Sequence, residues 1–221
     1  MRGPCLQARE DVTRRYSGCL SAVDSVLLLA FATILSGFVD NHLGQMQPIV
    51  HPIVGYLCYA AYTRFRHDSP PQSEPTVVAV GAAAIPDLID QPLWLAGVTP
   101  VGRTIAHSLF GAAVLVAVVT YLTRRAGRVD LGVVFGVGYL SHVLADIPWH
   151  LLVGDYHELG FLLWPVTEMP AYSGVKTVGT IGEVTVTTLW FEAAIALVGI
   201  LLWWYDGTPG LDTVSQYLPG R

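Results

Sequence analysis

The stretch TIAHSLFGAAVLVAVVTYLT, residues 104–123, decides how this chain folds. It contains no Asp, Glu, Lys or Arg, and arginines stand on either side of it, at Arg103 and Arg124. An α-helix needs about 20 predominantly apolar residues to cross the hydrocarbon core of a bilayer. Because the bilayer core offers no water to irregular backbone, a segment of this kind is predicted to be a transmembrane helix.

Similar apolar segments recur along the chain at intervals of roughly 25–30 residues, the length of one membrane crossing plus a short loop. The sequence therefore predicts an all-α, polytopic membrane helix bundle of about six transmembrane helices. Pro86 and Pro92 interrupt the third of them, and we expect the helix to break at Pro86, which lacks a backbone donor. The predicted spans cover residues 20–39, 48–65, 76–98, 104–123, 131–153 and 184–205.

The composition argues against a soluble domain and against a nucleic-acid-binding protein. Hydrophobic residues make up 52% of the 221-residue chain and charged residues only 13%, whereas ordinary soluble domains carry about 25% charged residues. The net charge of -5 gives no basic surface for nucleic acid. Lys176 is the single lysine among 12 basic residues, which together with much Ala, Val, Gly and Asp favours a prokaryotic source.

The basic residues set the predicted orientation, because cytoplasmic loops carry an excess of Lys and Arg. With the N-terminus in the cytoplasm, only Arg103 and Lys176 fall on the outer side. This threading predicts a multi-pass protein of the plasma membrane. If the second span enters the membrane and returns without crossing, the first span turns over and the later spans keep their placement. The predicted parts are a cytoplasmic tail with an additional transmembrane helix at 1–47, a membrane domain at 48–206 and a C-terminal tail at 207–221.

Several ionisable side chains fall within the predicted spans, where such groups are costly and usually have a function. Asp87 and Asp90 stand three residues apart, and His142 and Asp146 stand four apart, so each pair shares one helix face. In the predicted threading these groups lie in the outer half of the bilayer, together with two histidines near the outer ends of their spans. The whole set is His51, Asp87, Asp90, His107, His142 and Asp146.

Three imidazoles and three carboxylates form a mixed nitrogen and oxygen ligand set. Such a set suits Zn²⁺, Mn²⁺ or Fe²⁺, either as one ion or as two ions bridged by a carboxylate. Buried carboxylates without a cation would repel one another or take up protons. Each residue alone has an ordinary explanation, such as an interfacial histidine, a helix-capping aspartate or a structural hydrogen bond. Their joint occurrence at one depth is what favours a metal site.

Four motifs follow an early histidine, His51, in a fixed order. They are IPDLID at 85–90, RTIAHS at 103–108, SHVLAD at 141–146 and LLWP at 162–165. Together they resemble the membrane-bound metal-dependent hydrolases of the YdjM type. That family shows an early His, then Pro-Asp-x-x-Asp, Arg-x-x-Thr-His-Ser and Ser-His-x-x-x-Asp motifs and, in many members, a Trp-Pro pair.

The resemblance covers residues 51–165 and leaves the first span as an N-terminal addition. It implies a metal site made of the same six residues that depth and charge select. The chain departs from the family at two positions, with Gly102 where the family often has a histidine and Ala106 where it often has a threonine. A missing ligand, or a missing hydroxyl behind a ligand, would weaken metal binding.

The leading hypothesis is a metal-dependent hydrolase that acts at the outer leaflet on a membrane lipid or a lipid-linked phosphoester. The metal would polarise the scissile bond and lower the pKa of water toward about 7. Arg103 is expected to hold an anionic group such as a lipid phosphate. Glu192, or Glu168 in the predicted outer loop at 154–183, is expected to act as general acid or base.

Two other classes of function stay open. Intramembrane His and Asp also serve proton- or metal-coupled transporters, although a transport pathway would need polar residues that continue to the cytoplasmic face. A non-catalytic membrane protein could hold the same metal in a closed structural site. A metal held by fewer protein ligands than the site offers would favour catalysis over a structural role.

Overall fold

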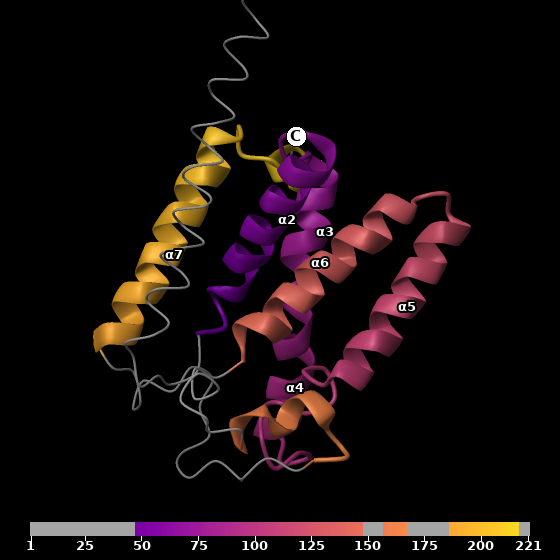
Figure 1. Ribbon diagram of the computed structural model, residues 1–221, viewed down its shortest axis with the longest axis vertical. Coiled ribbons are helices and arrows are strands. Elements are labelled where there is room, and N and C mark those ends of the chain that lie inside the picture. The colour runs from indigo at the N-terminus through magenta and orange to yellow at the C-terminus, as the bar shows by residue number, and fades with distance from the viewer. Residues whose placement is uncertain (1–46, 148–156, 168–185, 217–221) are drawn as a thin grey trace, which may run out of the picture. The chain divides into compact units, whose positions relative to one another are not determined.

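The computed structural model describes residues 47–147, 157–167 and 186–216, all within one compact unit, Asn41–Arg221. This part of the chain is all-α, as the sequence predicts (Figure 1). The predicted first span and most of the predicted outer loop, including Glu168, lie outside the described residues. The described elements are α2 (His51–His67), α3 (Ser73–Ala82), α4 (Ile85–Leu95), α5 (Leu109–Arg125), α6 (Val129–Ala145), the 3-10 helix η2 (His157–Leu163), α7 (Val186–Tyr205) and α8 (Leu211–Ser215).

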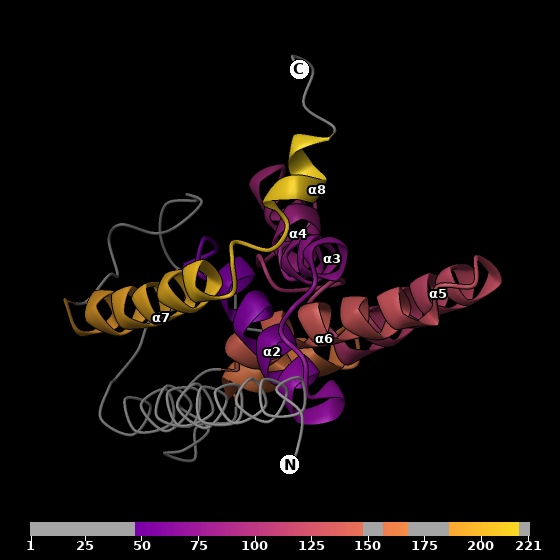
Figure 2. The same ribbon diagram turned by 90° about the horizontal axis from the view of Figure 1, so that it is seen from above.

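Helix α6 is the centre of the packing. It contacts α2, α3, α4 and α5, and α2 in turn contacts α7 (Figures 1 and 2). A Cβ atom on Gly138 of α6 would lie 2.2 Å from the carbonyl oxygen of Ala79 on α3. A Cβ atom on Gly132 would lie 2.8 Å from the Cα atom of Thr120 on α5. Glycine at these two crossings therefore lets the helix backbones approach closely, as is common where membrane helices pack.

A break at Ala83 and Ala84 divides the third predicted span into α3 and α4, as expected from Pro86. Pro86 lies in the first turn of α4, where backbone N–H groups have no partner within the helix anyway. Counted across this break, Ser73–Leu95 is the one helix among the described residues that is long and apolar enough to cross a membrane by itself. Val129–Ala145 and Trp190–Tyr205 are apolar but shorter.

Helix α5 begins later than the sequence predicts. The predicted span includes residues 104–108 as helix, but these residues form turns, and the helix starts at Leu109. Ser108 caps it, because its Oγ accepts a hydrogen bond of 3.0 Å from the backbone N–H of Gly111. The turns are held by backbone hydrogen bonds to Asp90 on α4, a tertiary contact that a hydropathy pattern does not contain.

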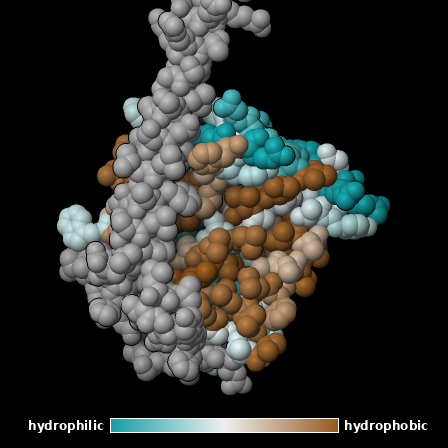
Figure 3. All heavy atoms as spheres, in the orientation of Figure 1, coloured by the Kyte–Doolittle hydropathy of each residue, from teal (hydrophilic) through white to brown (hydrophobic). Residues whose placement is uncertain are grey.

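The arginines of the described residues gather at one end of the bundle, apart from Arg103. This end is where α2 and α7 finish and where α5 turns into α6, and Figure 3 shows hydrophilic residues over it and a hydrophobic band across the middle. A buried ion pair between Arg64 and Asp206 joins α2 to the residue after α7, and Tyr56 donates a hydrogen bond to the same carboxylate. The arginines at this end are Arg64, Arg66, Arg124, Arg125 and Arg128.

Candidate metal centre

The other end of the bundle holds the ionisable residues that the sequence singles out. His51 is the first residue of α2, and Asp87 lies in the first turn of α4. His142 lies in the last turn of α6, and Asp146 caps the C-terminus of that helix. His107 lies in the turns just before α5. Four separate parts of the chain therefore bring their polar side chains to the place where three helices begin and one ends.

These side chains are almost completely removed from solvent. The three histidines are each at most 1% exposed, and Asp146 is 4% exposed. The side chain of Asp87 is more open, at 14%. Ionisable groups buried to this degree are stable only when they are paired, hydrogen-bonded or bound to a cation, so their partners decide what the cluster can do.

His107 and His142 both point their Nε2 atoms into the cluster. Nδ1 of His107 donates to Oδ2 of Asp90 at 2.8 Å, and Nδ1 of His142 donates to the carbonyl oxygen of Ala83 at 2.7 Å. Since these partners accept hydrogen bonds, they place the proton of each neutral imidazole on Nδ1 and leave a lone pair on Nε2. The two Nε2 atoms lie 3.0 Å apart.

Two carboxylates add oxygen atoms to the same point. Oδ2 of Asp146 lies 3.1 Å from Nε2 of His107 and 3.4 Å from Nε2 of His142. Oδ1 of Asp87 lies 3.6 Å and 3.9 Å from the same two nitrogens. Ligand atoms bound to one tetrahedral zinc ion at about 2.0–2.2 Å lie about 3.3–3.6 Å from one another. Oδ2 of Asp146 and the two Nε2 atoms are therefore spaced nearly as ligands of a single divalent ion would be, and Oδ1 of Asp87 lies slightly farther from both nitrogens.

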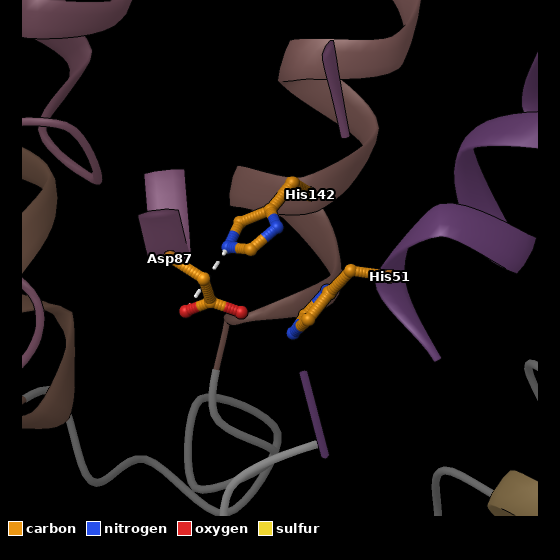
Figure 4. A group of neighbouring side chains, drawn as sticks. All are labelled: His51, Asp87 and His142. Carbon is orange, nitrogen blue, oxygen red and sulfur yellow. Dashed lines mark ion pairs between the residues drawn. The ribbon is translucent and has the colours of Figure 1, made fainter. Parts of the chain in front are cut away.

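His51 completes the cluster from α2. Its ring stacks on that of His142 with 3.9 Å between centroids, and its Nε2 lies 3.5 Å from Oδ1 of Asp146. Figure 4 shows His51, Asp87 and His142 converging from three helices. Nδ1 of His51 and Oδ2 of Asp87 are buried, and the structure gives them no hydrogen-bond partner among the described residues. A bound cation would satisfy buried polar atoms of this kind.

Two overlapping groups of side chains have ligand atoms close enough to hold a metal ion. In one, ligand atoms of His51, Asp87 and His142 lie within 4.8 Å of one another, and in the other those of His107, His142 and Asp146 do. The donor set is nitrogen and oxygen, which suits zinc, manganese or iron. Five of the six residues predicted from the sequence therefore have ligand atoms in these groups.

Asp90, the sixth, is brought to the site but lies behind His107. Its Oδ2 accepts from Nδ1 of His107 and from the backbone N–H groups of Thr104 and Ala106, at 2.8, 2.8 and 3.0 Å. The carboxylate is fully buried and holds both the imidazole and the turns that carry it. A carboxylate in this position fixes the tautomer and the ring orientation of a metal-binding histidine. The sequence predicts it as a ligand, whereas its contacts are those of a positioning group.

Arg103 is buried within the cluster. Its guanidinium donates to Oδ1 of Asp146 at 2.8 Å, and the two side chains are 6% and 3% exposed. The guanidinium also lies 5.6 Å from the ring centre of Phe161 in η2, which is fully buried. The sequence does not single out Phe161, although the motif that begins at the next residue marks this segment.

The structure shows what surrounds Gly102 and Ala106, the two positions at which the chain departs from the family pattern. A Cβ atom on Gly102 would lie 3.1 Å from Oε1 of Gln91, so the Gln91 side chain occupies the space beside this glycine. Nε2 of Gln91 donates to Oδ1 of Asp87 at 3.4 Å. Ala106 is 3% exposed, and its carbonyl oxygen accepts a hydrogen bond from the hydroxyl of Tyr139. Gln91 therefore supports a candidate ligand from the position that a larger residue at 102 would displace.

The predicted acid–base residue Glu192 is not brought to the cluster by any hydrogen bond or ion pair in the described parts of the chain. It lies on α7 and is 8% exposed. Its Oε1 accepts a hydrogen bond of 3.0 Å from the backbone N–H of Gln47, four residues before α2. The sequence predicts a depth for Glu192, but depth alone does not bring a side chain on another helix into contact.

Comparison with known proteins adds one finding. The sequence model of a family described as YdjM inner membrane protein matches residues 46–209. The match runs from just before α2 to beyond α7 and includes every residue of the cluster. No curated protein and no solved structure matches the chain at a significant level.

Proposed function

Because the chain belongs to the YdjM inner membrane protein family, we propose that it is an integral membrane, metal-dependent hydrolase whose metal is held by the His/Asp cluster. The observation that carries the proposal is the convergence of Nε2 of His107 and His142 on carboxylate oxygens of Asp146 and Asp87. With each neutral imidazole protonated at Nδ1, these are four acceptors that face one another. A divalent cation satisfies all four at once, and hydrolysis is a common use of such a centre.

The proposed membrane arrangement has about six spans, counting the additional one near the N-terminus, with the N-terminus in the cytoplasm. The separation of the arginine-bearing end from the cluster supports it, because arginines favour the cytoplasmic side. The helices α2, α5 and α6 have 17 residues each, or about 25 Å, slightly less than the roughly 30 Å of a bilayer core. The turns that carry the cluster would fill the remaining depth near the outer face, where irregular backbone is tolerated if protein covers it.

For the metal itself, we assign Asp87, His107, His142 and Asp146 as the ligands of one ion, with zinc the best match to the donors and manganese or iron as alternatives. His142 favours one ion over two. Its Nδ1 is occupied by Ala83, so a single nitrogen remains, and one nitrogen serves one ion. His51 lies next to this set and can act as a fifth ligand.

A bound divalent ion would supply Lewis-acid polarisation of the scissile bond and a lowered pKa of water. The chain's own residues prepare the site. Arg103 holds Asp146 through one carboxylate oxygen, which turns the other oxygen toward the two imidazoles. Asp87 is the most exposed of the proposed ligands, so a substrate would reach the cluster from its side. His51, whose Nδ1 has no described partner, is better placed than Glu192 to exchange a proton with a substrate.

We propose that the substrate is a membrane lipid or a lipid-linked phosphoester, and that Arg103 contributes positive charge beside the cluster.

A pathway for a transported ion finds less support. Between the cluster and the arginine-bearing end, the residues 109–123 and 131–141 of α5 and α6 contain no Asp, Glu, His, Lys or Arg. The same holds for residues 52–63 of α2 and 193–205 of α7. A polar route through the middle of the bundle would need such groups.

One observation favours a second candidate, a structural metal site. The four proposed ligands would complete a tetrahedral ion, and three of them are almost fully buried, as is usual for closed sites. The two candidates differ in turnover. A metal-loaded protein that hydrolyses a phosphoester or lipid-linked substrate, and loses this activity with its metal, supports the hydrolase. A loaded protein without turnover on a broad panel supports the structural role.

The first experiment is elemental analysis of the protein purified in detergent. We expect about one zinc, manganese or iron ion per chain in the wild type, and little metal in His142→Ala or Asp87→Ala. His67→Ala is the matched control, because His67 is exposed at the opposite end of α2 and should leave the metal content unchanged. Well-folded wild type without metal, or metal that both cluster substitutions leave in place, would rule the proposal out.

A further inference from the structure

A groove follows helix α5 along the side on which it meets α6, and it includes Leu140 of α6 in its lining. Only Ala112 of α5 is buried, so much of α5 is left uncovered by the parts of the chain that the structure describes. The groove has a volume of about 640 Å³ and runs the length of the helix, which is within the usual range of about 300–1,000 Å³ for ligand pockets. Its lining combines small side chains, Ala113 and Ala117, with larger ones, Leu109, Tyr121, Arg124 and Leu140.

Arg124 gives this groove a cationic end. Among the described residues its guanidinium has no ion pair, whereas the neighbouring Arg128 pairs with Glu74 at 2.7 Å. Arg125 donates to the hydroxyl of Tyr121 at 3.0 Å, so the second arginine of the pair is turned toward a residue that lines the groove. The groove is therefore apolar along its length and positively charged at the arginine-bearing end of the bundle.

This combination matches one class of ligand. From Leu109 to Arg124 the helix rises about 22 Å, which exceeds the roughly 15 Å that one leaflet contributes to the bilayer core. An acyl chain can therefore lie along Ala113 and Ala117 while its headgroup reaches the arginine. Basic pockets beside membrane helices bind anionic headgroups in this way. We propose that the groove binds one phospholipid with an anionic headgroup, its phosphate at Arg124 and one acyl chain against Ala113 and Ala117.

A second copy of the chain fits the groove less well. Two copies related by a twofold axis along the membrane normal would bring their Arg124 side chains to the same end of the shared interface. Like charges close together in a medium of low dielectric constant repel strongly. A phospholipid meets the same surface with an opposite charge. The site is independent of the proposed metal chemistry. In the proposed orientation, which puts the arginine-bearing end on the cytoplasmic side, the bound lipid would belong to the cytoplasmic leaflet.

The test is native mass spectrometry of the full-length protein released from detergent, titrated with phosphatidylglycerol or with phosphatidylcholine of identical acyl chains. We expect one molecule of phosphatidylglycerol to be retained in preference to phosphatidylcholine. Arg124→Gln should weaken phosphatidylglycerol retention roughly fivefold. Arg66→Gln is the matched control, because Arg66 is an exposed arginine at the same end of the bundle that does not line the groove, and it should bind as the wild type does.

A second pair of variants tests the apolar lining of the groove. Ala117→Phe should remove retention of either lipid by filling the groove, whereas Val114→Phe, on the same helix but not lining the groove, should leave it intact. If Ala117→Phe does not fold, the arginine pair decides alone. Equal retention of both lipids, or wild-type retention by Arg124→Gln, would overturn the proposal. So would a wild type that carries no phospholipid and is a dimer instead.

Discussion

His107 and His142 face each other through Nε2 atoms only 3.0 Å apart, although the Nδ1 atom of each already donates to another acceptor. Two lone pairs at this distance repel unless a proton or a metal ion lies between them. Oδ2 of Asp146 is a third acceptor, 3.1 Å from His107. One proton would bridge only two of these atoms, whereas a divalent ion satisfies all of them. This geometry makes occupancy of the cluster by a cation the central claim to test.

Asp90→Asn should weaken metal binding by roughly 10- to 100-fold, the usual effect of altering a group that orients a metal-binding histidine. Asn can still accept a hydrogen bond from the turns before α5, but it loses the charge that keeps the proton on Nδ1 of His107. Metal affinity is measured by competition with a chromophoric chelator in detergent. Asp130→Asn, at the arginine-bearing end, should leave the affinity unchanged. An unaltered affinity in Asp90→Asn would show that this carboxylate does not hold the imidazole.

Arg103→Ala should destabilise the metal-free protein more than the metal-loaded protein. Removing one partner of a buried ion pair costs about 3–5 kcal/mol, because the remaining charge has no compensation. In the metal-loaded protein, a bound divalent ion would balance part of the Asp146 charge that Arg103 no longer balances. Thermal unfolding with and without a chelator measures the difference.

The control for this prediction is Arg128→Ala. Arg128 also forms an ion pair, with Glu74, but the two side chains are 44% and 50% exposed. Exposed pairs of this kind contribute little to stability, so the unfolding temperature should hardly change in either condition. Equal effects of Arg103→Ala with and without metal would contradict the assignment of Asp146 as a ligand.

Local helix geometry is the part of the site that the sequence predicts well. His142 and Asp146 stand four residues apart and do point to the same place, because that spacing is one helical turn. The break between α3 and α4 follows from Pro86, whose effect on backbone hydrogen bonding is local. Apolar windows likewise predict α2, α6 and α7 to within a few residues, apart from the end of the fifth span.

Contacts between distant segments are the part that the sequence does not contain. Asp87 and Asp90 look equivalent in a three-residue spacing, yet one faces the Nε2 atoms and the other faces Nδ1 of His107. That difference depends on how the turns before α5 fold back over α4. The same limit applies to Glu192, whose depth is predicted but whose neighbours on other helices are not.

Gln91→Leu should weaken metal binding about fivefold, because it removes the hydrogen bond to Asp87, and a hydrogen bond contributes roughly 1 kcal/mol. Gly102→Val should have a similar effect in the wild type, since its side chain would press against Gln91. In the Gln91→Leu background the same Gly102→Val change should add little, because the hydrogen bond is already gone. The chelator competition gives all three affinities. Fully additive effects would mean that Gly102 and Gln91 act independently.

Gly138→Ala and Gly81→Ala should change stability in opposite directions. The new methyl group at Gly138 would lie 2.2 Å from the carbonyl oxygen of Ala79, so α6 must move away from α3. Overpacking of this kind costs about 1–3 kcal/mol. At Gly81 nothing lies within 4 Å of the new methyl group, and Ala is a better helix former than Gly by up to about 1 kcal/mol. Thermal unfolding of the two variants in the same detergent gives both signs.

The Gly138 variant should also lose metal affinity, although it lies outside the cluster. His142 follows Gly138 by one helical turn, and its Nδ1 reaches the carbonyl oxygen of Ala83, one turn after Ala79. A displacement of α6 from α3 therefore lengthens the hydrogen bond that aims Nε2 at the other ligands. Gly81→Ala leaves this contact alone and should keep the wild-type affinity. If Gly138→Ala binds metal as tightly as Gly81→Ala, the packing of α6 on α3 does not position His142, and the close approach of the two helices serves stability alone.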